Sequence, residues 1–205
     1  ADLVCGLVVL TGESAGLMPQ RRYWGQLDRA TFAFGYGLMV TPLQLAHVYA
    51  TIGSYGIERP LSITRIDPPV MGTRVMPERI VHEVEHMMES VALPGGGGTK
   101  AAVRDYRVAV KTGTAKKIGP DGKYIDKYVA YTAGVAPASN PKFALVVVMN
   151  DPSNGSYYGG AVSAPVFSQI MGDVLRLENV MPDGMPQGAE NLIVMHRDGA
   201  PSPAL

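Results

Sequence analysis

Arg107-Val-Ala-Val110, Tyr128-Val-Ala-Tyr-Thr-Ala-Gly-Val135 and Phe143-Ala-Leu-Val-Val-Val-Met149 follow one another in the second half of the chain. Such runs of β-branched, aromatic and small residues are typical of β-strands. Turn residues separate them, with Pro120-Asp-Gly122 in the first interval and Ser139-Asn-Pro141 in the second. Because the intervals are short enough for hairpins, we expect three antiparallel neighbours in one sheet.

Helical periodicity is found on both sides of these strands. Helices are predicted to begin at Thr41-Pro42, at Pro77 and at Ser163, where prolines or capping hydroxyls precede apolar stripes. The stripes that we expect to be buried are Leu45, Val48, Tyr49 and Ile52; Ile80, Val84, Met87, Met88 and Val91; and Val166, Phe167, Ile170, Met171, Val174 and Leu175. Helices, three antiparallel strands and a closing helix together predict an α+β fold.

The length of 205 residues suits one domain with a sizeable core. We expect residues 1–178 to belong to this domain, with residues 1–27 rich in loops. Residues 179–205 have little periodicity and several prolines, so they are predicted to form a disordered tail.

Composition excludes several classes of partner. Hydrophobic residues make up 46% of the chain and charged residues 18%, as in globular proteins. Lys+Arg and Asp+Glu balance at 18 each, so no nucleic-acid partner is expected. No apolar run reaches the roughly 18 to 20 residues that span a bilayer, so we expect any membrane anchor to lie outside this chain. His82 and His86 have no ligand set around them and are interpreted as one helix face; neither metal nor cofactor is expected.

Lys111-Thr-Gly-Thr114 lies at the end of the first predicted strand, just after Val108-Ala-Val110. The Lys111 ammonium attracts a carboxylate, and the hydroxyls of Thr112 and Thr114 can donate hydrogen bonds to it. Gly113 lets a substrate backbone lie close, and an exposed strand edge can pair with a peptide. Taken alone, the motif also fits a strand that simply runs into a turn.

Further stretches carry a resemblance to a known family. They are Phe34 to Ala46, Ala50 to Ile57, Met87 to Gly98, Val110 to Lys117 and Tyr131 to Pro137. Over about residues 12–178 the chain resembles the division-specific penicillin-binding transpeptidases of Gram-negative bacteria. In such serine penicillin-recognising enzymes a K-T-G element is the third signature motif. The resemblance implies part of a serine β-lactamase/transpeptidase-like fold, in which the three strands here are the C-terminal ones of a five-stranded sheet.

The resemblance also implies roles for the motif. Lys111 would organise charge and protons near the nucleophile, and Thr112 and Thr114 would hold the carboxylate of a peptidoglycan stem peptide or of a β-lactam. The backbone N–H of Thr114 would form half of the oxyanion hole. Tyr124 and Tyr128 could line the pocket, whereas Tyr131 is equally well explained by sheet packing.

Two upstream signatures of this family are absent from the sequence. One is a Ser-x-x-Lys whose serine attacks the D-Ala–D-Ala carbonyl, and the other is Ser-x-Asn. Ser139-Asn-Pro-Lys142 matches the first pattern, but it lies in a predicted turn, where no helix N-terminus can be built. We therefore expect this chain alone to be inactive and the complete protein to be a serine acyltransferase.

Two alternatives remain open beside the transpeptidase: a serine β-lactamase relative, and a non-catalytic periplasmic interaction module of the division machinery. The resemblance implies a location at the periplasmic face of the inner membrane, at the septum, with membrane proteins of division as partners. The strand Phe143 to Met149 would have a bare apolar edge, which predicts association in solution.

Overall fold

The three predicted strands form one antiparallel sheet in the order β3-β4-β5. The computed structural model describes residues 14–20, 22–153 and 155–184. The strands of this sheet are β3 (Ala109–Ile118), β4 (Tyr124–Ala136) and β5 (Phe143–Asn150), and a ribbon pairs β1 (Ile57–Glu58) with β2 (Thr73–Arg74). The helices are α1 (Gln26–Ala33), α2 (Pro42–Gly53), α3 (Glu78–Glu89), the short 3-10 turn η1 (Thr99–Ala101), α4 (Gly159–Val162) and α5 (Ala164–Leu177).

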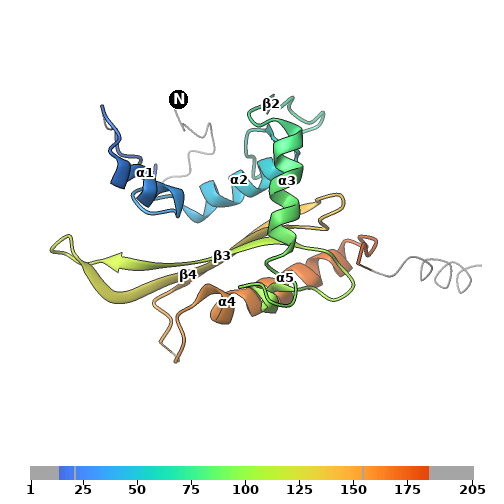
Figure 1. Ribbon diagram of the computed structural model, residues 1–205. Coiled ribbons are helices and arrows are strands. Elements are labelled where there is room, and N and C mark those ends of the chain that lie inside the picture. Colours follow the sequence, from blue (N-terminus) through green and yellow to red (C-terminus); the bar gives the residue numbers. More distant parts are fainter. Residues whose placement is uncertain (1–13, 21, 154, 185–205) are drawn as a thin grey trace, which may run out of the picture.

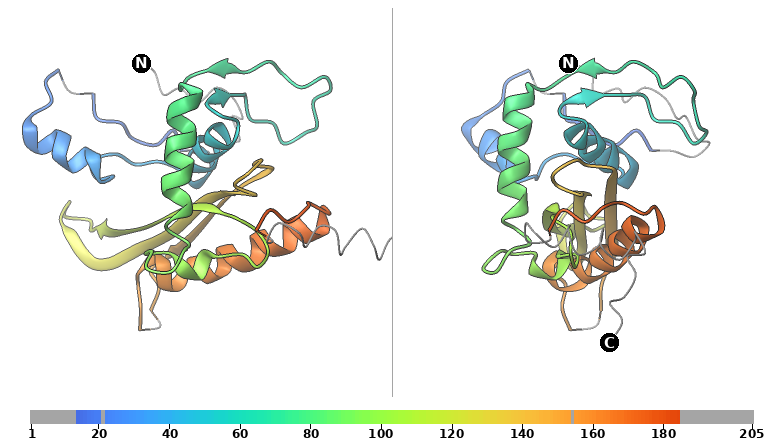
Figure 2. Two further views of the ribbon diagram at one scale, coloured as in Figure 1. Left: turned by 45° about the vertical axis from the view of Figure 1, so that its right-hand side comes forward. Right: turned by 90° about the vertical axis from the view of Figure 1, so that its right-hand side faces the viewer.

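Helices cover the sheet on both faces, with α2 and α3 on one side and α4 and α5 on the other (Figures 1 and 2). Successive side chains of a strand point to opposite faces of the sheet, so the residues around β3 contribute to a core cluster on each face. Val108 and Val110 pack in one cluster with Phe167, Met171 and Leu175 of α5. The second cluster joins Ala109, Ala133 and Val135 of the sheet to Tyr49 of α2 and Met88 of α3. The predicted α+β fold is confirmed.

The hairpin of β3 and β4 is longer than the sequence indicated. The first strand was predicted to end with the motif at Lys111 to Thr114 and the second to start at Tyr128, but pairing continues outward to Ile118 and Tyr124. The outer half is largely polar and exposed, so it lacks the apolar run that marks a buried strand. Lys111 to Thr114 therefore lie in the middle of β3, with a paired strand on one side.

The helix starts are confirmed, whereas some predicted buried positions are not. Thr41 caps α2 by accepting from the Gln44 N–H at 3.1 Å, and the Gln44 side chain returns a bond to Thr41 N. Val48 of α2 is nevertheless 45% exposed, as is Ile170 of α5 at 41%. Helix α1 was not predicted at all, because it buries no side chain and so has no apolar stripe.

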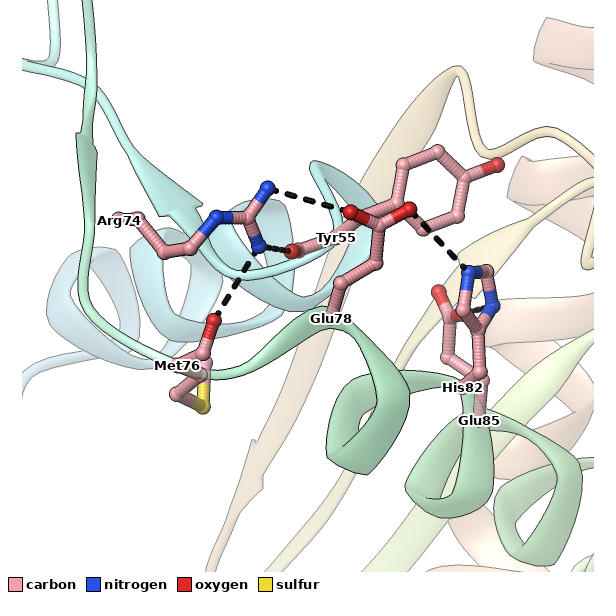
Figure 3. A network of polar contacts seen from close by, with 6 residues as sticks. All are labelled: Tyr55, Arg74, Met76, Glu78, His82 and Glu85. Carbon is pink, nitrogen blue, oxygen red and sulfur yellow. Dashed lines mark hydrogen bonds and ion pairs between the residues drawn. The ribbon is translucent and has the colours of Figure 1, made fainter.

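A polar network fastens α3 to the β1–β2 ribbon (Figure 3). Arg74 donates to the carbonyl oxygens of Tyr55 at 2.9 Å and Met76 at 3.3 Å, and pairs with Glu78 at 3.3 Å. His82 lies between two carboxylates, with Nε2 3.9 Å from Glu78 and Nδ1 3.5 Å from Glu85. The histidine that the sequence placed on a helix face is thus part of this structural network.

The first residues of the predicted tail are held against the domain. Val180 O accepts from the Tyr106 hydroxyl at 2.7 Å, and Asp183 accepts from the N–H groups of Arg107 at 2.7 Å and Ser139 at 3.0 Å. These residues, which the sequence assigned to the tail, therefore contact the domain. The rest of the predicted tail, residues 185–205, lies outside the described residues.

None of the helices in the described part of the chain has the length and apolarity that a membrane crossing requires.

Candidate active site

Strand β3 presents the Lys-Thr-Gly-Thr motif on an edge of the sheet. Thr112 and Thr114 share one face with Val110, toward α4 and α5, and Lys111 and Gly113 share the other with Ala109. The edge of β3 that faces away from β4 has no partner strand among the described residues. A peptide could therefore pair there as an added strand.

An open pocket of about 390 Å³, here called the motif pocket, lies along this strand. Thr112, Gly113 and Thr114 line it from β3, the loop of residues 97–100 lines one side, and residues 158–161 line another. The predicted binding residues Thr112, Gly113 and Thr114 are thus brought together at one cavity. Its volume is in the usual range for small-ligand sites.

Two lysines give this region a positive potential. Lys111 is exposed, and its ammonium donates to the neighbouring carbonyl oxygen of Thr112 at 2.6 Å. Lys100, which the sequence did not single out, lines the pocket from η1. Neither lysine forms an ion pair with a carboxylate in the described ranges 14–20, 22–153 and 155–184. With the hydroxyls of Thr112 and Thr114, the site suits a carboxylate ligand.

A buried chain of hydroxyls supports Thr114 from behind. The Gly159 N–H donates to Thr114 Oγ1 at 3.1 Å. Ser163 Oγ donates to the Gly159 carbonyl at 2.9 Å and lies 2.8 Å from Thr132 Oγ1, both hydroxyls being fully buried. Because Thr114 Oγ1 accepts from Gly159, its own proton remains available for a ligand.

Gly113 has a second reason to be glycine. A Cβ built there would lie 2.0 Å from Cζ of Tyr131, the residue opposite it on β4. The Tyr131 ring therefore occupies the space above Gly113, and sheet packing is the better account of this tyrosine. Burial, and secondarily Tyr36, raises the pKa of Tyr131.

The other two predicted tyrosines lie in different places. Tyr128 stacks on Tyr157 with centroids 3.9 Å apart, and Tyr157 contacts Tyr158, which lines the pocket. Tyr128 therefore reaches the pocket through two further rings that sequence reasoning missed. Tyr124 does not line this pocket and instead contacts Tyr36 edge-to-face at 6.1 Å.

Residues 7–172 match the family model described as "Penicillin binding protein transpeptidase domain". This chain belongs to the penicillin-binding transpeptidase family. It is 70% identical over 188 residues to "Peptidoglycan D,D-transpeptidase FtsI" of Escherichia coli K12, covering 92% of this chain and 32% of that protein. It is 41% identical over 172 residues to "Probable peptidoglycan D,D-transpeptidase PenA" of Neisseria gonorrhoeae, covering 83% of this chain and 29% of that protein.

A solved structure agrees with this assignment. The apo transpeptidase domain of Burkholderia pseudomallei penicillin-binding protein 3 matches with a TM-score of 0.81 at 40% identity, over 88% of this chain and 55% of that chain. The predicted resemblance to penicillin-binding protein 3 is confirmed. The chain spans about a third of the length of the curated relatives that it matches.

The chance match to the transpeptidase nucleophile motif lies where the sequence placed it, in the turn between β4 and β5. Ser139 uses its N–H to bind Asp183, and Lys142 uses its N–H to bind the Ala136 carbonyl. Neither residue begins a helix or lines the motif pocket. In the described part of the chain, no group of three or more His, Cys, Asp and Glu side chains could hold a metal ion.

Lys100, Tyr158 and Gly159 line the pocket of this transpeptidase domain but were not among the predicted site residues. Lys100 comes two residues after the last of four consecutive glycines, a pattern that signals only a loop. The Tyr157-Tyr158-Gly159-Gly160 stretch combines aromatic residues with glycines in a loop, and this could have marked a ligand contact.

Proposed function

We propose that this chain forms one wall of the active site of a peptidoglycan D,D-transpeptidase. In this proposal Thr112 and Thr114 hold the terminal carboxylate of a donor stem peptide, or the equivalent carboxylate of a β-lactam. Lys111 supplies positive charge and organises protons at the nucleophile. The donor backbone lies along the β3 edge at Gly113, and the Thr114 N–H stabilises the developing oxyanion.

One observation carries the proposal: Thr112, Thr114 and Lys100, a lysine without an ion pair among the described residues, line one pocket beside an open strand edge, and the exposed Lys111 lies next to Thr112 on the same strand. A carboxylate there would replace water by charge-assisted hydrogen bonds, which are the stronger kind. The names of the relatives agree with this chemistry.

The reaction would be acyl transfer in two steps. A serine hydroxyl adds to the carbonyl of the penultimate D-alanine, its proton passes to a base, and the terminal D-alanine leaves with a proton on its amine. An amine of a second stem peptide then takes the acyl group and releases the serine. We assign no serine of this chain as the nucleophile, because Ser139, whose sequence context matches Ser-x-x-Lys, lies in a turn and does not line the pocket.

A chimera tests the proposal, with this chain replacing the matching third of E. coli FtsI. We expect a fluorescent penicillin to label the chimera stably, and Lys111→Ala to slow labelling by roughly a hundredfold, as for other groups that stabilise such transition states. Lys123→Ala, an exposed lysine outside the pocket, is the matched control and should label normally. Normal labelling of Lys111→Ala would overturn the assignment.

The same experiment separates the alternatives. Rapid release of the label would favour a β-lactamase relative, which hydrolyses the acyl-enzyme. A folded chimera that never labels would favour a non-catalytic interaction module.

We also propose that the complete protein acts at the periplasmic face of the inner membrane, at the division septum, together with membrane proteins of division. The division-linked relatives support this placement. A fluorescent fusion of the chimera should concentrate at midcell, and uniform envelope fluorescence would contradict the proposal.

A further inference from the structure

The outer end of the β3–β4 hairpin lies beneath α1 and the segment that follows it (Figures 1 and 2). Residues of both parts line a second pocket. Its volume is about 250 Å³, and it is lined by Phe34, Tyr36, Lys116 and Tyr124. We propose that this pocket binds a sugar ring of the peptidoglycan glycan strand, an inference that rests on the proposed function.

The three rings form a connected but open wall. Tyr36 contacts Phe34 edge-to-face at 6.0 Å and Tyr124 edge-to-face at 6.1 Å. Phe34 is still 69% exposed and Tyr124 59% exposed. Edge-to-face contacts fix the rings while much of their surface remains in water, and such grouped aromatic surface typically marks a binding site.

The charge in the pocket is already balanced. The Lys116 ammonium lies 3.6 Å from Asp126 Oδ1 and 5.5 Å from the centroid of the Tyr128 ring. An anionic ligand would have to compete with Asp126 for this cation. The site therefore favours a neutral ligand over a carboxylate, in contrast to the pocket beside the Lys-Thr-Gly-Thr motif, whose Lys100 forms no ion pair among the described residues.

A pyranose ring fits both properties. Its C–H face can cover an aromatic ring, and its hydroxyl and acetamido groups can stay in water or bond to polar side chains at the rim. The volume is below the roughly 300–1,000 Å³ of sites for drug-sized ligands, which suits a single ring.

The position of the pocket connects it to the same substrate. Lys116 follows Thr114 by two residues on β3, which is about 7 Å along a strand. A stem peptide held at the motif and a sugar held at the hairpin would thus belong to one peptidoglycan strand. Tyr131 is common to both regions, because its ring covers Gly113 and Tyr36 contributes to the rise in its pKa.

Saturation-transfer NMR of this chain with the neutral disaccharide di-N-acetylchitobiose tests the proposal. We expect saturation transfer from the unchanged chain to the ring protons of the sugar. Tyr124→Ala should weaken binding by about fivefold or more, because one aromatic contact is lost. Phe34→Ala should weaken binding in the same way. If circular dichroism shows that one of these two variants is misfolded, the other variant still tests the proposal.

Tyr23→Ala is the matched control, since this tyrosine is 81% exposed and lies outside the pocket. The proposal is overturned if the unchanged chain shows no transfer to the sugar, or if Tyr124→Ala and Phe34→Ala bind it as well as Tyr23→Ala does. Penicillin labelling of the FtsI chimera is a separate measurement that tests the transpeptidase proposal. Suppose that chitobiose binds this chain and needs Tyr124, but penicillin never labels the chimera. The transpeptidase proposal would then be wrong, whereas the sugar site would be supported.

Discussion

At the scale of single residues, Gly113 of the binding strand packs directly against the ring of Tyr131 on the neighbouring strand. The Tyr131 ring lies over Gly113, with Cζ, the hydroxyl oxygen and Cε1 within 2.0 to 2.5 Å of where a Cβ would be. Any side chain at residue 113 must displace that ring. The ring is half-buried and contacts the sheet, so its displacement would disturb the face opposite the threonine hydroxyls.

We therefore expect Gly113→Ala to lower the free energy of unfolding by about 1–3 kcal/mol, the usual cost of forcing an extra carbon into a packed site. Urea denaturation measures this change. The double variant Gly113→Ala/Tyr131→Ala provides the control, because removing the ring removes the clash. If the substitution at Gly113 costs as much without the ring as with it, the steric explanation fails.

Ser163 gives a second prediction at this scale. Its hydroxyl bonds to both Thr132 and the Gly159 carbonyl, and all three residues are buried. Ser163→Ala would leave the Thr132 hydroxyl without this partner, so we expect a loss of about 1–3 kcal/mol in the free energy of unfolding. Ser168→Ala, at a half-buried position of α5, removes only a hydroxyl bond to the Ala102 carbonyl and should cost clearly less. Equal losses in the two variants would argue against a supporting role for Ser163.

At the scale of elements, α3 has a charged residue in the middle of its buried face. Val81, Glu85 and Met88 are buried, and Glu85 is only 4% exposed. Its Oε1 has no hydrogen-bond partner among the described residues. Burial raises the pKa of Glu85, while His82 opposes the rise and Glu89 adds to it.

This raised pKa predicts that stability depends on pH. The folded state holds the Glu85 proton more tightly than the unfolded state, so this site stabilises the fold most below pH 4.5 and loses that contribution as pH rises through the folded pKa. Glu85→Gln should therefore raise the free energy of unfolding at pH 7, by about 1 kcal/mol, and have little effect at pH 4. Thermal melts across this pH range measure the difference. Glu83→Gln, on the exposed side of the same helix, should show no such trend.

Glu85 also explains what the sequence could and could not predict. The stripe Ile80, Val84, Met87, Met88 and Val91 was predicted to be buried because these residues are apolar, and a charged residue such as Glu85 is seldom buried. The real face is rotated, so Ile80 is 38% exposed and Met87 62% exposed. Caps, turns and strand order follow from local chemistry and were predicted. The direction of a helix face depends on what lies against it, here the β1–β2 ribbon and the sheet.

Some residues of the candidate site could likewise be predicted from the sequence, and others could not. Lys111 to Thr114 could be found because their chemistry is contiguous in sequence, and the structure places three of them at one pocket. Lys100, Tyr158 and Gly159 come from loops before and after the strands, and only the folded sheet brings them to the motif. No spacing rule connects residues 100 and 158 with residue 112.

For the whole molecule, the open sheet edges matter most. β5 has a partner only on its β4 side among the described residues, and it consists largely of apolar residues, with Val148 39% exposed. An unpaired apolar strand is a template for pairing with a second chain. We therefore expect the isolated chain to associate with increasing concentration, and sedimentation velocity should show a shift to larger species.

Val148→Lys should suppress that association, because a charge on an edge strand opposes strand addition. Met71→Lys adds the same charge at a residue that is 91% exposed in the loop between β1 and β2, and it should leave association unchanged. If both lysines reduce association equally, net charge rather than the β5 edge controls it. A sharp monomeric melt of the unchanged chain at all concentrations would show that the edge is protected in another way.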